Sequence, residues 1–257
     1  MTFVRWHDRT VRRMRIVTPP LPAEIATHDG ISYSLWLPEP PKEVRGGVLI
    51  LHGAGSCKES HHDFARAVLP LGLAALAFDQ RGHGASDGAL GASVLDDTAV
   101  MAGLLRERIG GAEAKLAVRG SSMGGLISIL CAKRVRAAVV VAICPASVAG
   151  LRRLLTRDDL QFKADVDELD ALLDTVDLTA TVSALSAPML LLHAEGDEQV
   201  PVEHSRELAA YMASPGSRLL AIPGGHHRSI QHDEELQAVS LRFIDRALRG
   251  RLASSPS

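Results

Sequence analysis

The sequence predicts an α/β protein built on a mostly parallel β-sheet with helices on both faces. Short, continuously apolar segments recur along the chain, as expected for strands that are buried on both faces. They span residues 46–53, 73–79, 115–120, 137–144, 188–194 and 217–223. Amphipathic segments of helical length separate most of them and span residues 62–70, 93–109, 123–133, 203–213 and 233–249. Strands that alternate with helices favour parallel pairing through helical crossovers.

Two segments depart from this alternation. Residues 31–38 (ISYSLWLP) alternate between apolar and polar side chains, which predicts an early, half-exposed strand. More than forty residues separate the strand that ends at Cys144 from the strand that begins near Met189. This interval is charged and amphipathic, which predicts helices, and long insertions after central strands commonly lie over the sheet. We therefore expect residues 146–176 to form a lid, with an ordinary crossover helix as the alternative.

Composition limits the classes of function. The chain has 257 residues, of which 46% are hydrophobic and 23% charged, and its net charge is −2. These values predict one globular domain over residues 1–257 and give no overall positive field that would bind nucleic acid or an anionic membrane. No apolar run is long enough to span a bilayer, and no apolar signal segment follows the basic residues near the N-terminus.

The three cysteines predict a reducing environment. Cys57, Cys131 and Cys144 are odd in number and lack the spacing of metal ligands, so we expect free thiols and a cytoplasmic protein. The chain also lacks a dinucleotide-binding fingerprint and a phosphate-binding loop. The sequence therefore predicts neither a cofactor nor a metal, and it gives no indication of oligomeric state.

The segment GSSMG (120–124) matches the pattern G-x-S-x-G, with Ser122 at its centre. It lies between a predicted strand and a predicted helix, which is the setting of a nucleophile elbow. A sharp strand-to-helix turn leaves no room for side chains two positions before and after the nucleophile, which explains Gly120 and Gly124. Ser122 is therefore the candidate nucleophile and Ser121 its small neighbour, whereas an ordinary glycine-rich turn is the alternative.

A serine hydroxyl needs a base to remove its proton, and candidates for that base follow other predicted strands. The segment IPGGHHRS (222–229) supplies His226 and His227, and HAEGDEQVP (193–201) supplies Asp197. Loops that follow parallel strands meet at one edge of a sheet, where ligand sites form. Serine, aspartate, histidine is one of the chain orders in which the catalytic triad occurs. The residues alone leave both histidines open as the base.

Four blocks together resemble the α/β-hydrolase family over residues 24–249. They are LHGAG (51–55), DQRGHGASDG (79–88), GSSMGG (120–125) and the pair HAEGDEQVP with PGGHHR. The second block and the short insertion are similar to the lysophospholipase or monoglyceride-lipase-like and small-esterase branches. The resemblance implies an eight-stranded, mostly parallel sheet with helices on both faces and a short helical lid.

The resemblance also implies roles for individual residues. The family pattern P-x-x-x-H places the base four residues after Pro223, which selects His227 over His226. The family position of the acid fits Asp197 better than either flanking glutamate, Glu195 or Glu198. The oxyanion hole would be formed by two backbone N–H groups, those of Ala54 and Met123. Such preorganised donors stabilise the charge that develops on the carbonyl oxygen in acyl transfer.

These assignments predict a serine hydrolase that cleaves carboxylic esters through an acyl-enzyme, with a small-molecule ester as its substrate. A C–C bond hydrolase, thioesterase, amidase or acyltransferase would use the same triad, so these reactions remain alternatives. A non-catalytic ligand receptor on the same fold is a further alternative, although such a protein usually lacks a triad member. A dehalogenase or epoxide hydrolase needs an aspartate nucleophile, which Ser122 contradicts.

The predicted lid suggests the size of the substrate. Residues 146–176 contain one aromatic side chain, Phe162, and eight aliphatic positions that would form one apolar face, namely Leu151, Leu154, Leu155, Leu160, Val166, Leu169, Leu172 and Leu173. A small aliphatic lid suits short or medium acyl chains, because each buried CH₂ contributes only about 0.8 kcal/mol. We expect kcat/KM to peak below about ten acyl carbons.

Other polar residues near these blocks are expected to have structural roles. Asp79, Arg81 and His83 are interpreted as a turn that braces the loop below the site, and His52 as a buried, hydrogen-bonded loop residue. The adjacent histidines 61 and 62 point in different directions on a helix. We therefore expect a solvated helix start there rather than a metal site.

Overall fold

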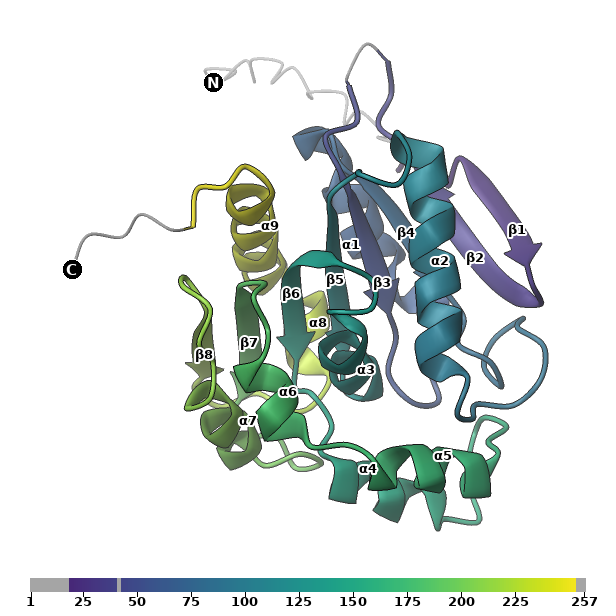
Figure 1. Cartoon of the computed structure of the whole chain (residues 1–257), viewed down its shortest axis with the longest axis vertical. Coiled ribbons are helices and arrows are strands. Elements are labelled where there is room, and N and C mark those ends of the chain that lie inside the picture. The colour runs from purple at the N-terminus through teal and green to yellow at the C-terminus, as the bar shows by residue number, and fades with distance from the viewer. Residues whose placement is uncertain (1–18, 41–42, 253–257) are drawn as a thin grey trace, which may run out of the picture.

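The computed structural model describes residues 19–40 and 43–252 (Figure 1). Within them, eight strands form one sheet: β1 (Glu24–His28), β2 (Ile31–Trp36), β3 (Gly47–Leu51), β4 (Ala74–Phe78), β5 (Leu116–Ser121), β6 (Ala137–Ile143), β7 (Met189–Ala194) and β8 (Arg218–Ile222). Their spatial order is β1-β2-β4-β3-β5-β6-β7-β8. The strands from β4 to β8 in this order are parallel, whereas β2 is antiparallel to both β1 and β4. The predicted mostly parallel, eight-stranded sheet is confirmed.

Helices cover both faces of the sheet. Apolar side chains of α2 (Val94–Ile109) and α3 (Met123–Cys131) pack in one core, and those of α1 (His62–Ala67) and α9 (Glu234–Leu248) pack in another. Successive residues of β3 alternate between these two cores, which explains why the whole strand is apolar. Among the described helices, none combines the length and the hydropathy that crossing a bilayer requires.

The parallel register brings the carboxyl ends of the central strands to one edge of the sheet. Leu51 of β3 lies beside Gly120 of β5, and Ser121 lies beside Ile143 of β6. On the other side of β6, Ala194 of β7 lies beside Ile222 of β8. The loops that follow β3, β5, β6, β7 and β8 therefore open at the same edge, where the predicted site residues occur.

The long insertion folds into two helices at this edge, α4 (Val148–Leu155) and α5 (Val166–Asp174), below the strand ends in Figure 1. The side chains of Ser147 and Asp165 cap their first turns, as these residue types favour. The segment between the helices pairs with the loop after β4: the Lys163 N–H donates to the Gly82 carbonyl, and the Leu90 N–H donates to the Lys163 carbonyl. The remaining α-helices of the described residues are α6 (Leu178–Ser183), α7 (Val202–Ala209) and α8 (Ser229–His232).

Strand β2 differs from the sequence prediction of half exposure. All six of its residues are buried. Its apolar side chains Ile31, Tyr33 and Leu35 join the core of α2 and α3, as alternation predicts. Ser32 and Ser34 face the other way, where the chain also covers the strand; the Ser32 N–H donates to Ser86 Oγ at 2.8 Å. The face of β2 that carries Ser32 and Ser34 also carries the fully buried Trp36, so it is an interior face.

Candidate active site

Ser122 occupies a strained turn between β5 and α3. Its φ of 53° and ψ of −120° lie where residues other than glycine are rarely found. A side chain at position 120 would place its Cβ 2.1 Å from the Gly124 carbonyl oxygen, and one at position 124 would lie 2.4 Å from the Leu51 carbonyl oxygen. Glycine is therefore required at both positions, which is the reason predicted from the sequence.

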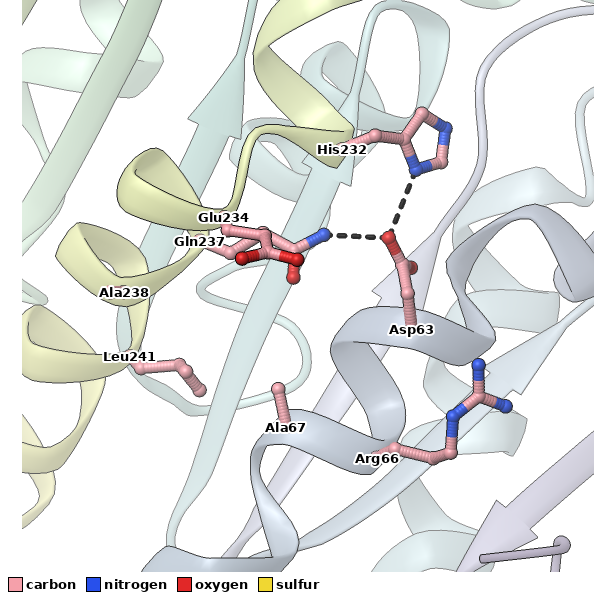
Figure 2. A pocket seen from close by; sticks show the side chains of 8 residues that line it. All are labelled: Asp63, Arg66, Ala67, His232, Glu234, Gln237, Ala238 and Leu241. Carbon is pink, nitrogen blue, oxygen red and sulfur yellow. Dashed lines mark hydrogen bonds and ion pairs between the residues drawn. The ribbon is translucent and has the colours of Figure 1, made fainter. Parts of the chain in front are cut away.

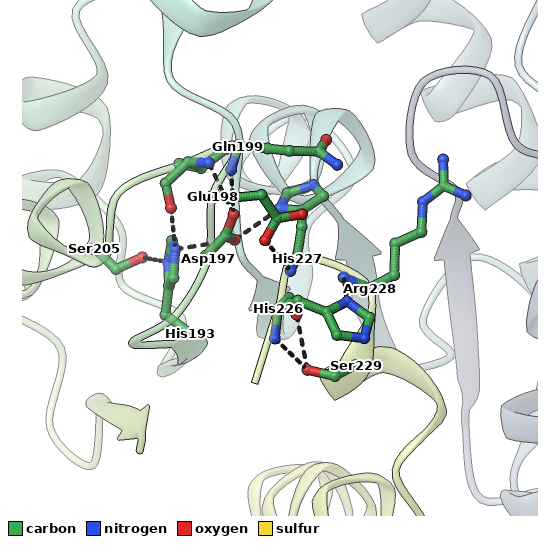
Figure 3. Close-up of polar contacts among 10 residues, drawn as sticks. His193, Asp197, Glu198, Gln199, Ser205, His226, His227, Arg228 and Ser229 are labelled. Atoms are coloured by element: carbon green, nitrogen blue, oxygen red, sulfur yellow. Dashed lines mark hydrogen bonds and ion pairs between the residues drawn. The ribbon is translucent and has the colours of Figure 1, made fainter. Parts of the chain in front are cut away.

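Asp197 and His227 are brought together from the loops after β7 and β8. The His227 Nδ1 donates to Asp197 Oδ2 at 2.7 Å, and both residues are only 8% exposed (Figure 3). The other carboxylate oxygen, Oδ1, accepts the N–H groups of Gln199 and Val200, each at 2.9 Å. With Nδ1 as the donor, Nε2 is the nitrogen of a neutral His227 that can accept a proton.

The environment of Asp197 keeps its carboxyl ionised. Burial alone raises the pKa of this group, but hydrogen bonds from His193, His227 and the backbone N–H groups of Val200 and Gln199 outweigh that effect. Together they hold the pKa of Asp197 well below its ordinary value. The carboxylate can therefore accept from His227 throughout the neutral range of pH.

The alternative residues lie in different surroundings. His226 is exposed, and its backbone N–H donates to Ser229 Oγ at 3.0 Å. Glu195 is exposed and pairs with Arg206 at 2.7 Å. Glu198 is also exposed and accepts the backbone N–H of His227 at 3.5 Å. Of the candidate acids and bases, Asp197 and His227 are the two whose side chains are joined.

The predicted oxyanion donors, Ala54 and Met123, belong to segments that border Ser122. Met123 is the first residue of α3, so its N–H belongs to the helix turn that lacks intrahelical acceptors. Ala54 follows Gly53, and a Cβ built on Gly53 would lie 3.3 Å from the Ser122 Cβ. The loop after β3 and the start of α3 thus both border the serine.

The structural roles expected for His52, Asp79 and Arg81 agree with their contacts. The His52 Nδ1 lies 2.8 Å from the Gly53 carbonyl, and its Nε2 accepts the Gln80 N–H at 3.0 Å. Burial lowers the pKa of His52 to about 4, so the ring is neutral. Asp79 binds Lys58 Nζ at 2.8 Å, and the Arg81 Nε donates to the Asp97 carboxylate. The expected solvated helix start is wrong at one position, because His61 is only 1% exposed.

Two residues near Asp197 were missed by the sequence analysis as members of the site. His193 of β7 is fully buried, and its Nε2 lies 3.4 Å from Asp197 Oδ2. Its signal in the sequence is a polar residue inside an otherwise apolar strand. Cys144 follows β6 at a positive φ of 41°, and its sulfur, an Asp197 oxygen and a His227 nitrogen lie within 4.8 Å of one another.

Cys144, Asp197 and His227 offer donor types that bind zinc. Asp197 Oδ2 and His227 Nδ1 are 2.7 Å apart, however, whereas two such ligands on one tetrahedral zinc would be about 3.3 Å apart. Burial also raises the pKa of the Cys144 thiol. The geometry therefore fits a hydrogen-bonded pair beside a thiol better than a set of metal ligands.

A separate groove of about 400 Å³ lies between α1 and the segment of α8 and α9 (Figure 2). Within it, Asp63 Oδ2 accepts from His232 Nδ1 at 3.0 Å and from Gln237 Nε2 at 2.7 Å. None of the predicted site residues lines this groove. The groove is therefore separate from the predicted site at the strand ends.

Part of the chain matches a known family model, and curated proteins are similar over most of its length. Residues 42–164 match a family model described as serine aminopeptidase, S33. The uncharacterized protein YfhR of Escherichia coli O157:H7 is 25% identical over 242 residues, which cover 88% of this chain and 80% of that protein. The uncharacterized protein Rv2307c of Mycobacterium tuberculosis H37Rv is 27% identical over 219 residues, which cover 79% and 70% of the two chains.

Solved structures share the fold. A soluble variant of monoglyceride lipase from Saccharomyces cerevisiae, in complex with a substrate analog, aligns with a TM-score of 0.68 at 16% identity and covers 96% of this chain and 100% of its own. Monoacylglycerol lipase from Paleococcus ferrophilus aligns with a TM-score of 0.67 at 21% identity and covers 86% of this chain and 99% of its own. Est1E from Butyrivibrio proteoclasticus with bound ferulic acid aligns with a TM-score of 0.65 at 23% identity and covers 90% of this chain and 100% of its own. The chain therefore has the α/β-hydrolase fold.

Proposed function

We propose that this chain is a serine hydrolase that cleaves carboxylic esters through an acyl-enzyme. Ser122 is the nucleophile, His227 the general base and Asp197 the acid that orients the base. The observation that carries the proposal is the 2.7 Å hydrogen bond between His227 Nδ1 and Asp197, at the sheet edge where the Ser122 turn lies. Two of the similar structures are named as a monoacylglycerol lipase and a monoglyceride lipase.

The proposed reaction begins with proton transfer. His227 Nε2 accepts the proton of the Ser122 hydroxyl as the serine oxygen attacks the ester carbonyl. The imidazolium that forms is stabilised by the Asp197 carboxylate across the Nδ1 hydrogen bond. The same proton then passes to the leaving alcohol, and water repeats the sequence to release the acid.

The oxyanion of the tetrahedral intermediate is proposed to accept the N–H groups of Ala54 and Met123. One such donor contributes roughly 3–4 kcal/mol to the stability of the transition state. Met123 is favoured because α3 begins there, and the positive end of its helix dipole faces the developing charge.

Helices α4 and α5 are proposed to form the lid predicted at residues 146–176. Buried leucines of both helices meet Met123 and Leu126 of α3 around an aliphatic cavity of about 10 Å³, which has room for about one water molecule. Val166 is 40% exposed and does not join this apolar face. With the helices in this position the cavity has no room for an acyl chain of any length, so the proposed preference for short or medium chains rests on the small number of apolar residues in the lid.

The three free cysteines support a reducing environment for the protein. We therefore propose a cytoplasmic location. The proposed substrate is a small-molecule ester. A thioesterase, C–C bond hydrolase or acyltransferase would use the same triad. Comparing the rates of hydrolysis of model esters and model thioesters distinguishes an esterase from a thioesterase.

A fluorophosphonate probe tests the proposed nucleophile, because it modifies serines that are activated by a base. The wild-type protein should be labelled and should hydrolyse p-nitrophenyl butyrate, and Ser122→Ala should do neither. Ser121→Ala is the matched control, because Ser121 is the buried last residue of β5. Labelling that survives Ser122→Ala and disappears in Ser121→Ala would contradict the assignment.

A further inference from the structure

His193 connects three parts of the structure around the carboxylate of Asp197. The ring is fully buried in β7. Its Nδ1 lies 2.7 Å from Ser205 Oγ on α7, and its Nε2 lies 2.8 Å from the Val200 carbonyl oxygen. The same Nε2 lies 3.4 Å from Asp197 Oδ2. Figure 3 shows the ring between Ser205 and Asp197, on the side of the carboxylate opposite His227.

These contacts select one tautomer of His193. Nε2 faces two oxygen atoms that can only accept, the Val200 carbonyl and the Asp197 carboxylate, so Nε2 carries the hydrogen. Nδ1 then accepts the hydroxyl hydrogen of Ser205. In this tautomer the ring accepts from Ser205, donates to the Val200 carbonyl and directs the same N–H toward the Asp197 carboxylate.

We propose that His193 is a positioning residue that holds Asp197 in the orientation in which it accepts from His227. The inference rests on the proposed function. Oδ1 is held by two backbone N–H groups, whereas Oδ2 has His227 on one side and His193 on the other. The His193 N–H favours the ionised carboxylate and resists its rotation away from His227.

The bond to Val200 gives His193 a second effect on the same loop. Val200 is both a donor to Asp197 Oδ1, through its N–H, and the acceptor of the His193 N–H, through its carbonyl. Because a buried carbonyl without a partner is costly, loss of the ring would also release the segment that carries Asp197. Both effects act on Asp197, which orients His227 in the chemical step. The proposed role therefore concerns kcat more than the binding of substrate.

Two variants of His193 separate this role from simple core packing. In His193→Gln the amide nitrogen reaches approximately the position of Nε2, so it can still donate toward Val200 and Asp197. In His193→Asn the shorter amide reaches only the position of Nδ1 and cannot donate to Asp197. We expect His193→Asn to lower kcat for p-nitrophenyl butyrate about tenfold or more at unchanged KM, the effect of losing one hydrogen bond to a charged group. His193→Gln should restore most of that loss.

The rate of fluorophosphonate labelling should follow kcat, because both depend on activation of Ser122. His61→Asn is the matched control for loss of a buried histidine, since His61 is 1% exposed and lies outside the candidate site; its kcat should equal that of the wild type. A folded His193→Asn with wild-type kcat, a loss confined to KM, or an equal loss in His193→Gln or His61→Asn would overturn the inference.

Ser205→Ala provides the test if His193→Asn does not fold. This variant keeps the ring and removes the hydroxyl that fixes Nδ1, so kcat should fall about threefold at unchanged KM, the effect of one weak hydrogen bond. Wild-type kcat in Ser205→Ala would overturn the inference. If the wild-type protein itself is not labelled at Ser122, the proposed function fails; if it is labelled and the His193 variants match it, the positioning role alone fails.

Discussion

The substitution Asp197→Asn should inactivate the enzyme through a change of histidine tautomer. The backbone N–H groups of Gln199 and Val200 both donate to Oδ1 at 2.9 Å, so the amide oxygen of the new asparagine takes that position. Its NH₂ group then replaces Oδ2 and faces His227 Nδ1, which lies 2.7 Å away in the native protein. Two donors cannot share that contact, so the imidazole hydrogen moves to Nε2.

A His227 ring with its hydrogen on Nε2 cannot accept the proton of Ser122. We expect kcat to fall about 10⁴-fold, the loss seen when a triad aspartate becomes asparagine with its geometry intact. This corresponds to about 5.5 kcal/mol in the activation free energy. KM should change little, because the substitution replaces one buried group by another of similar size.

Steady-state hydrolysis of p-nitrophenyl butyrate measures this loss, and the rate of fluorophosphonate labelling provides a second readout. Glu195→Gln is the matched control, because Glu195 is an exposed carboxylate in the same loop whose partner is Arg206. Its kcat should stay within about twofold of the wild type, as for most surface substitutions. A loss of less than tenfold in Asp197→Asn, or an equal loss in Glu195→Gln, would refute the reasoning.

Three further outcomes are expected. His227→Ala should reduce kcat by several orders of magnitude and His226→Ala far less, and the reverse pattern would exchange their roles. The kcat/KM of p-nitrophenyl esters should peak below about ten acyl carbons, and a steady rise through the palmitoyl ester would contradict the lid argument. Because the pKa of His52 is lowered from 6.5 to about 4, the unfolded chain binds more protons than the folded chain between these values. The contribution of His52 to the free energy of unfolding should therefore fall by about 3 kcal/mol as the pH drops through this window, and His52→Gln should show a shallower decline in thermal midpoint.

The parallel part of the sheet could be predicted from the sequence because its strands are buried on both faces. Such strands are apolar throughout, and this signal does not depend on the rest of the fold. The edge strand β1 has no such signal, since its burial pattern is mixed and Ile25 is 66% exposed. The polar residues Ser32 and Ser34 predict a half-exposed β2, although the chain covers that face as well.

The candidate triad was predictable because each member lies in a short segment with a recognisable pattern. The place of His193 and Cys144 beside Asp197 could not be predicted in this way. Each lies at or near the end of an apolar strand, and the contact with Asp197 depends on the path of the loop after β7 rather than on local sequence. The buried state of His61 likewise depends on α8 and β5 packing around it, which no pattern within its own helix indicates.

The strained conformation of Ser122 follows from the way the surrounding chain restrains it. A residue at such backbone angles costs about 1–3 kcal/mol and persists only where neighbouring contacts fix it. The Ser122 N–H donates to the Ile143 carbonyl at 2.9 Å, and its own carbonyl accepts the N–H groups of Leu126 and Ala146, each at 3.0 Å. These partners belong to β6, to α3 and to the loop before α4, so three separate parts of the fold hold one residue. A substitution that loosens any of them should therefore reduce activity before it unfolds the protein.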